Sequence, residues 1–333
     1  MIISERSEVE AVYRYASKKG WVLPCFCSEN LTTTEAVLSA AGDYAKANNI
    51  ERMPVVLAIT CAYAHRSQAS YYTNTGDVKT GLELFYNDIK VLTGKGGPFE
   101  HIDVLIHLDH IQHDLDHEIA YSDLSRFSSI MYDASSLPLS ENIRKTAEFV
   151  KAKGKEIFIE GACDEIVEAT GDKHNDITKA SSAKKYLEET GADIIVANLG
   201  TEHRATGKDL FYHGDAAREI KDLIGTRIVL HGTSSVTNKQ VKNLFSDGIC
   251  KVNIWTALER DSSPAIFEDM IKNAVLAAGP EKVEKLIGEG YLTPKCLTNE
   301  KISIAHFTSA HRNKIMFEEI KKMVTAYFEM WYN

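Results

Sequence analysis

Short apolar segments recur eight times between residues 21 and 255, and helix-like segments separate them. The apolar runs are WVLPCFC (21–27), PVVLAITC (54–61), IDVLIHLDH (102–110), FSSIMYDAS (127–135), KEIFIEGAC (155–163), ADIIVANLG (192–200), TRIVLHGT (226–233) and GICKVNIW (248–255). Strands that are apolar on both faces and alternate with helices form parallel sheets, because the crossover helices cover the faces. Eight such units predict a closed (β/α)8 TIM barrel, an α/β fold.

The intervening segments have helical character. Examples are TTTEAVLSAAGDYAKANN (32–49), SENIRKTAEFVKAKG (140–154), ASSAKKYLEETG (180–191) and TNKQVKNLFSDG (237–248). Several end in a glycine suited to a C-cap, and Thr237 and Gln240 have the spacing of a capping box. A doubly wound open sheet is the competing fold, although no G-x-G-x-x-G motif follows the first run. We expect one barrel domain over residues 1–333, with a C-terminal helical extension at about 300–333.

Composition limits the classes of partner. The chain has 333 residues, a formal net charge of −9 and a hydrophobic fraction of 44%, as in ordinary globular proteins. It contains no block rich in lysine and arginine, so we expect no nucleic-acid partner. We also expect no membrane segment, because no apolar stretch approaches the length of a span. The six scattered cysteines suit reduced thiols in a cytoplasmic protein.

Polar residues gather at the carboxyl ends of the predicted strands. They are Asp109 and His110, Asp133, Glu160, His203, His231 with Gly232, and Asn253. In a barrel these ends meet on one face, where the active sites of this fold are built. Three histidines remote in sequence would converge there, and three neutral imidazoles with an open position make a catalytic zinc site. A lone histidine at a strand end is more often only hydrogen-bonded, but three on one predicted rim favour a metal site.

Other histidines have alternative interpretations. His107 alternates with His110 along the strand, and we expect it to face the barrel interior as a hydrogen-bonded packing residue. His113 and His117 have i, i+4 spacing. That spacing suits either a second metal or, more simply, a solvated helix face.

The ordered motifs HLDH, IMYDASSLPLSENIRKT, VANLGTEHRA, VLHGTSSV and GICKVNIWT resemble the metal-dependent class II fructose-bisphosphate and tagatose-bisphosphate aldolase family. The resemblance runs from about residue 21 to 260. It implies a lyase that cleaves or forms a carbon–carbon bond in a ketose or ketose phosphate. In that family, one catalytic zinc ion, or another divalent metal, stabilises an enediolate. The resemblance also implies a sugar or sugar phosphate as the ligand, and a homo-oligomer, dimer or larger.

The resemblance assigns roles residue by residue. His110, His203 and His231 match the zinc ligands, and Asp109 matches the aspartate that exchanges a proton with the aldehyde half. Asn30 and Asn253 match substrate-facing asparagines, and Gly232 and Ser234 match residues of the phosphate-binding turn. Asp133 matches an aspartate that orders the ligands. Glu160 matches the first acid of an E-x-E pair whose second acid is Ala162 here.

Several positions depart from the family pattern. The turn after the seventh strand reads HGTSS, Arg204 stands where glycine is usual, and Trp255 stands where a small or acidic residue is common. These changes predict a substrate other than ordinary fructose-1,6-bisphosphate, with Arg204 as a candidate anion contact or a space-filling residue. Glu165 and Glu168 are candidates for the base that removes the donor proton, and Arg66 for a contact at the acceptor end. The lost acid at Ala162 leaves open a catalytically silent barrel with a binding or regulatory role.

Overall fold

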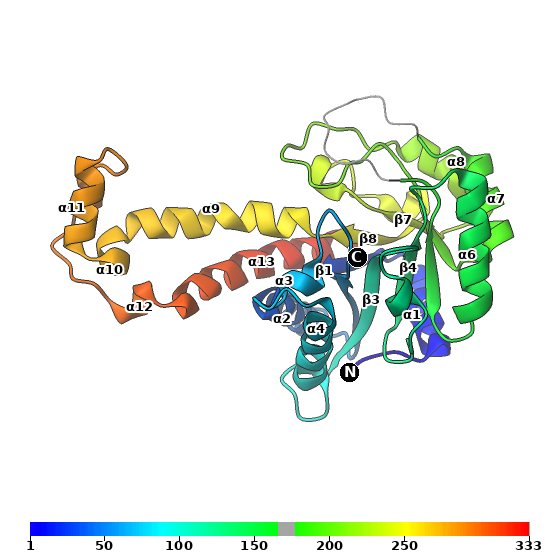
Figure 1. Cartoon of the computed structure of the whole chain (residues 1–333), viewed down its shortest axis with the longest axis horizontal. Helices are drawn as coiled ribbons and strands as arrows, with labels where there is room; N and C mark the ends of the chain where they lie inside the picture. The colour runs from blue at the N-terminus through cyan, green and yellow to red at the C-terminus, as the bar shows by residue number, and fades with distance from the viewer. Residues whose placement is uncertain (166–176, 333) are drawn as a thin grey trace.

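A computed structural model describes residues 1–165 and 177–332, and eight parallel strands close into a barrel in sequence order (Figure 1). The strands are β1 (Leu23–Cys27), β2 (Met53–Thr60), β3 (Ile102–Gln112), β4 (Ser129–Asp133), β5 (Phe158–Ala162), β6 (Ile194–Val196), β7 (Ile228–Leu230) and β8 (Ile249–Ile254). The barrel closes through β1 and β8, where Cys25 pairs with Asn253. The predicted TIM barrel is therefore confirmed, and the open sheet is excluded.

Helices cover the outside of the barrel. They are α1 (Arg6–Lys19), α2 (Leu31–Ala47), α3 (Gln68–Tyr71), α4 (Val78–Thr93), α5 (His117–Ala120), α6 (Leu139–Lys153), α7 (Ala180–Thr190) and α8 (Gly214–Ile224). Local sequence explains their ends: the Asp77 side chain accepts a hydrogen bond from the Thr80 amide at the start of α4, and Gly191 closes α7 in a left-handed conformation. None of the helices in the described part of the chain is long and apolar enough to cross a membrane.

The predicted helix at 237–248 is wrong. Turns occupy most of this segment, followed by the 3-10 helix η2 (Leu244–Asp247). A capping box requires the Gln240 side chain to turn back to the Thr237 amide. Instead, its oxygen accepts from the Tyr212 amide and its nitrogen donates to the Leu210 carbonyl. A tertiary contact with the preceding crossover therefore replaces the local cap.

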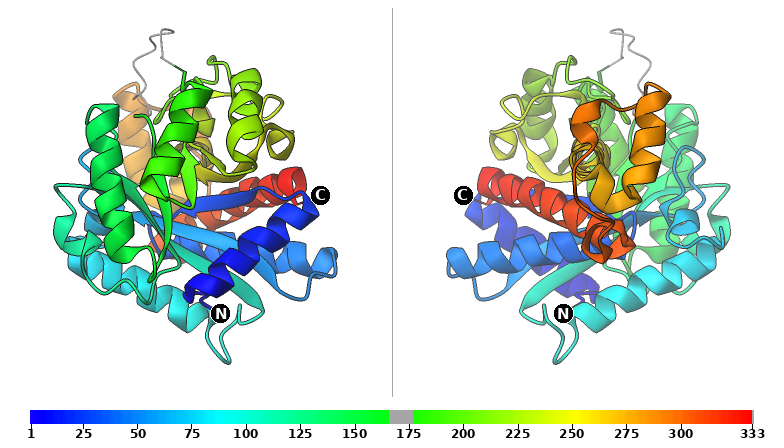
Figure 2. Two further views of the ribbon diagram at one scale, coloured as in Figure 1. Left: turned by 90° about the vertical axis from the view of Figure 1, so that its right-hand side faces the viewer. Right: turned by 90° about the vertical axis from the view of Figure 1, so that its left-hand side faces the viewer.

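After β8 the chain leaves the barrel as a long arm. Helix α9 (Thr256–Lys272) runs outward and α13 (Ser309–Trp331) returns beside it, while α10 (Ala274–Ala278), α11 (Pro280–Gly288) and α12 (Ile304–Phe307) lie toward the tip (Figure 1). The two 3-10 helices outside the 237–248 segment are η1 (Thr233–Ser235) and η3 (Pro294–Cys296). Figure 2 shows the tip end-on in its right-hand view. The barrel end of α13 packs against α2, with Phe328 and Trp331 buried.

Candidate metal centre and active site

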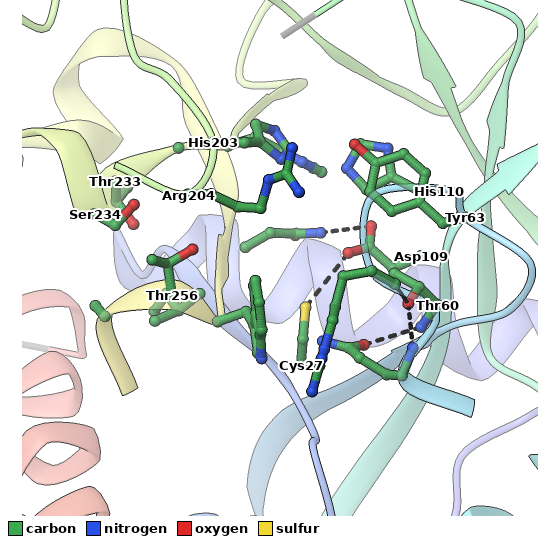
Figure 3. Close-up of a pocket in the computed structure, with 18 residues that line it drawn as sticks. Cys27, Thr60, Tyr63, Asp109, His110, His203, Arg204, Thr233, Ser234 and Thr256 are labelled. Carbon is green, nitrogen blue, oxygen red and sulfur yellow. Dashed lines mark hydrogen bonds between the residues drawn. The ribbon is translucent and has the colours of Figure 1, made fainter. Parts of the chain in front are cut away.

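Three histidines converge at the carboxyl end of the barrel. His110 lies in β3, His203 follows β6 and His231 follows β7 directly. One ligand atom from each ring lies within 4.8 Å of the other two. His110 and His231 are buried, and His203 is half-buried. All three line one cavity of about 560 Å³ together with Asp109 and Asn253 (Figure 3).

An irregularity in β3 places two neighbouring side chains in this cavity. Successive residues of a regular strand point to opposite faces. Here the register between β3 and β4 shifts between Leu108 and Ile111, and His110 adopts a left-handed φ of 48°. Asp109 and His110 therefore both line the cavity, as expected where a bulge re-aims a side chain beside an active site. Strand β3 continues to Gln112, two residues beyond the predicted end.

Carboxylates orient two of the three imidazoles. Asp133 Oδ2 lies 2.8 Å from His110 Nδ1, and Glu160 Oε1 lies 3.3 Å from His231 Nε2. An ionised carboxylate only accepts hydrogen bonds, so these contacts place the protons on His110 Nδ1 and His231 Nε2. They leave His110 Nε2 and His231 Nδ1 for a metal. Among the described residues, His110 Nε2 and His203 Nε2 are buried without a hydrogen-bond partner.

Burial and neighbouring charges shift the pKa values of the site in different directions. Burial lowers the pKa of His203 well below its usual value, and the nearby His110 and His231 lower it further. Burial would also lower the pKa of His110, but the Asp109 and Asp133 carboxylates outweigh it and raise the pKa to about 8. Burial would raise the pKa of Asp109, yet the surrounding histidines hold it well below its ordinary value. Asp109 is therefore an ionised carboxylate.

Two groups hold the Asp109 carboxylate in the cavity. Asn253 Nδ2 donates to Oδ1 at 2.8 Å, and Cys27 Sγ donates to Oδ2 at 3.3 Å. Burial and the adjacent Asp109 charge raise the pKa of the Cys27 thiol well above its usual value, so the thiol stays protonated and acts as a donor. Figure 3 shows both contacts. Asp109 is thus fixed beside the histidines with its charge directed into the cavity.

A buried ion pair lies beneath the histidines. Lys251 Nζ is 2.6 Å from Glu160 Oε2 and 3.1 Å from His107 Nε2. All three side chains are fully buried. His107 Nδ1 is 2.8 Å from Ser129 Oγ. Burial would raise the pKa of Glu160, but Lys251 and His231 lower it to about 2. Lys251 therefore keeps Glu160 ionised where it orients His231, and the packing role predicted for His107 is confirmed.

One end of the cavity suits an anion. Gly232 has a left-handed φ of 70°, and a Cβ there would lie 2.8 Å from the Glu202 backbone, so only glycine fits this turn. Thr233, Ser234, Thr256 and Ala257 line the same end. The latter two begin α9, whose N-terminus has no side-chain cap. The first amides of a helix have no intrahelical partner and favour negative charge.

The other side of the cavity is formed by segments that follow β1, β2 and β8. The Tyr63 ring stacks on His110 at 4.5 Å between ring centroids. Arg66 and Trp255 also line the cavity, and the Glu29 carboxylate contacts both. Arg204 reaches across from the segment after β6, and its guanidinium donates to the His65 carbonyl at 3.1 Å.

The structure brings most of the predicted residues together. The cavity lining includes Asp109, His110, His203, Arg204, His231, Gly232, Ser234 and Asn253, with Asp133 and Glu160 directly behind the histidines. Asn30 is not among them: its side chain accepts a hydrogen bond from the Thr33 amide as the N-cap of α2. Its role as a substrate contact stays a prediction. Glu165 is exposed, and Glu168 lies outside the described residues.

Sequence reasoning missed several residues of the site. Cys27 was predicted only to be one of six reduced thiols, although it ends β1, and the carboxyl ends of barrel strands face the site. Lys251 carried a signal, because a lysine within an apolar strand needs a buried partner. Glu29 and Tyr63 carried none, because they lie in loops whose course depends on tertiary contacts. His113 and His117 do not belong to the histidine cluster.

Comparison with known proteins agrees with this arrangement. The family profile described as fructose-bisphosphate aldolase class-II matches residues 7–327. Fructose-bisphosphate aldolase from Campylobacter jejuni is 20% identical, with a TM-score of 0.76 over 99% of this chain and 95% of that one. The YdjI aldolase from Escherichia coli K12 is 17% identical, with a TM-score of 0.66 over 99% and 97%. A putative fructose-1,6-bisphosphate aldolase from Coccidioides immitis is 18% identical, with a TM-score of 0.67 over 98% and 96%.

Proposed function

The chain belongs to the class II fructose-bisphosphate aldolase family, and on that basis we propose that it is a metal-dependent aldehyde-lyase acting on a ketose or ketose phosphate. The observation that carries the proposal is the convergence of three imidazoles and one ionised aspartate in a single cavity. That set of groups can hold a metal and move a proton beside it.

The histidine cluster fits a zinc ion. Three imidazole nitrogens with no fourth protein ligand among the described residues are a donor set of catalytic zinc, and two of the rings are held by hydrogen bonds that they donate to Asp133 and Glu160. His110, His203 and His231 would bind the ion, with another divalent cation as the alternative. When bound, the metal supplies a Lewis acid that polarises the ketose carbonyl and stabilises the negative charge formed on bond cleavage.

Asp109 is the proposed proton carrier. In cleavage, its carboxylate takes the proton from the hydroxyl group on the carbon that becomes the aldehyde, and the electrons of the broken carbon–carbon bond stay with the ketone half. In the reverse direction the same proton returns to the new hydroxyl. Asn253 and Cys27 orient Asp109 for this transfer by donating to its two oxygens.

The Gly232 turn and the start of α9 are the proposed site for an anionic group on the donor half. Arg260 supports this end, because its guanidinium donates to the carbonyls of Ala205 and Ser234 and holds the two turns together. We propose that the complete substrate differs from ordinary fructose-1,6-bisphosphate. Arg204 and Trp255 reshape the cavity relative to the family pattern, so one phosphate, another anion or none is the expected charge.

Donor activation tests the proposal without knowledge of the aldehyde. Proton NMR of zinc-loaded protein with dihydroxyacetone phosphate in deuterated water should show exchange of one carbon-bound hydrogen. The exchange should be lost in His203→Ala. If only unphosphorylated dihydroxyacetone exchanges its hydrogen, that ketone is the donor and the proposed enzyme class still holds. Tight zinc binding without exchange on any ketone would contradict the proposal and favour a catalytically silent barrel.

We propose, in addition, a homo-oligomer, dimer or larger, and a cytoplasmic location. The arm supports the oligomer, because Phe267, Tyr291 and Ile304 are 67–78% exposed on it and large exposed apolar side chains favour association. Sedimentation velocity should give at least twice the monomer mass of 37.1 kDa. A monomer at micromolar concentration would contradict the oligomer and leave the lyase proposal intact.

A further inference from the structure

A single carboxylate joins the two side chains that form the far side of the cavity. Glu29 Oε1 forms an ion pair with the Arg66 guanidinium, and Glu29 Oε2 accepts a hydrogen bond from Trp255 Nε1 at 3.0 Å. The Glu29 side chain is only 12% exposed. These three residues, Glu29, Arg66 and Trp255, are called the Glu29 cluster below.

Aromatic rings hold the guanidinium of this cluster. Arg66 lies 4.3 Å from the Tyr71 ring centroid and 5.5 Å from that of Trp255. A guanidinium stacked on aromatic faces keeps a fixed plane and direction. Because Arg66 also lines the cavity, its position is set before a substrate binds.

The charge of Arg66 is already compensated. The Glu29 carboxylate is in contact with the Arg66 guanidinium. The Glu259 carboxyl lies near it: Arg66 lowers the pKa of Glu259, although burial raises that pKa by more. A phosphate dianion that approached Arg66 would meet its guanidinium and the Glu29 carboxylate together. Like charges brought together where water is excluded weaken binding, whereas a hydroxyl group carries no such penalty.

Neighbouring hydrogen-bond donors on this side are engaged within the protein. Thr60 Oγ1 donates to the Arg66 carbonyl and accepts from the Gln68 amide, and Gln68 Oε1 accepts from the Thr60 amide. In contrast, Arg66 Nε is buried and has no hydrogen-bond partner among the described residues. One neutral acceptor, such as a sugar hydroxyl, would satisfy it.

We propose that the Glu29 cluster is the specificity determinant for the aldehyde half, and that it selects an uncharged, hydroxylated aldehyde over a phosphorylated one. The inference rests on the lyase proposal above. Arg66 and Trp255 provide a planar surface and a donor for hydroxyl groups, while Glu29 opposes a second negative charge. Any phosphate on the substrate then sits across the cavity, on the Gly232 turn.

Glu29→Gln is the direct test, because it keeps the size of the side chain and one of its two acceptor oxygens and removes its charge. The assay is aldol addition, using the donor that exchanges in the NMR experiment, to D-glyceraldehyde and to D-glyceraldehyde 3-phosphate. In the unmodified protein, kcat/KM should favour the neutral aldehyde by about tenfold or more. In Glu29→Gln, the ratio of phosphorylated to neutral kcat/KM should rise by about tenfold.

Two further variants serve as controls. Glu259→Gln should move the ratio in the same direction by a smaller factor, because this carboxylate is not in contact with Arg66 through an ion pair. Glu118→Gln makes the same chemical change at an 85% exposed surface position and should leave the ratio unchanged. Thermal melting and donor exchange establish that each variant is folded and activates its donor.

Three outcomes would overturn the inference. One is a preference of the unmodified protein for the phosphorylated aldehyde, and another is an unchanged ratio in Glu29→Gln. The third concerns Arg204→Ala. If the unmodified protein uses the phosphorylated aldehyde well and this variant does not, Arg204 is the residue that binds the phosphate. Failure of the lyase proposal looks different, because no donor would then exchange its hydrogen in any variant.

Discussion

The two sides of the cavity are built from different parts of the fold. Asp109, His110 and Asn253 lie within strands, and His231 follows one directly. In contrast, Glu29 and Arg66 lie in the connections after β1 and β2. Strand positions are held by hydrogen bonds to neighbouring strands on both sides, whereas a connection is held only by its own contacts. The strands therefore position most of the groups of the proposed chemistry, with His203 as the exception in the connection after β6, and connections position the proposed specificity.

His203→Ala should have the largest effect. A metal supplies several kcal/mol of charge stabilisation, so donor exchange and cleavage should each fall by roughly a thousandfold for every aldehyde. Zinc affinity, measured by competition with a chelating dye, should fall with them. His113→Ala removes an imidazole outside the cluster and is the matched control. Unchanged zinc affinity in His203→Ala would contradict the assignment of the metal to the histidine side of the cavity.

Asp109→Asn should separate the two half-reactions. Removing a positioned proton-transfer group costs about 10²- to 10⁴-fold, and here the loss should fall on carbon–carbon bond cleavage. Donor exchange should be affected much less, because another group removes that proton. Cleavage is followed by an aldehyde-trapping assay and exchange by NMR. An equal loss in both would show that Asp109 serves both steps.

Lys251→Met should affect stability and metal binding together. It leaves the Glu160 charge buried without its partner, which should lower the free energy of unfolding by about 3–5 kcal/mol. Zinc affinity should fall by about 10- to 100-fold, because Glu160 no longer orients His231 reliably. Urea unfolding and zinc titration measure the two effects. Adding Glu160→Gln should restore stability more than zinc affinity, and a fully stable single variant would contradict this account.

Trp255→Phe should have the smallest effect, confined mainly to the specificity side. It keeps an aromatic ring near Arg66 and removes the hydrogen bond to Glu29. The KM of the aldehyde should rise by about threefold to tenfold, since a typical intramolecular hydrogen bond contributes about 1 kcal/mol. Donor exchange should change by a smaller factor. A greater loss of exchange than of aldehyde binding would mean that the two sides of the cavity are not separable.

Local patterns in the sequence were reliable wherever one physical requirement dominated. Eight apolar runs were predicted to be strands because they are short and alternate with amphipathic, helix-like segments. His110, His203 and His231 were predicted to converge because the carboxyl ends of barrel strands share one face. Asn30 is the N-cap of α2, a role that suits an asparagine directly before a helix, and its substrate contact stays a prediction.

Other features depended on contacts between distant segments. Gln240 was predicted to cap a helix and instead binds the Tyr212 backbone. The bulge that lets Asp109 and His110 share the cavity arises from the pairing of β3 with β4, which no local pattern shows. Cys27 gained its role only when β1 came to lie beside β8, where Asn253 holds the other oxygen of Asp109.

The barrel and the identity of its proposed metal-binding residues follow from the sequence alone, because both depend on the periodic burial of strands and on the end at which parallel strands place their side chains. Tertiary structure decided the ring nitrogens left for the metal, through Asp133 and Glu160, and the charge balance around Arg66, through Glu29. These properties depend on distances between residues far apart in the chain. Electrostatic interactions and hydrogen bonds act over a few ångströms in space, whatever the separation in sequence.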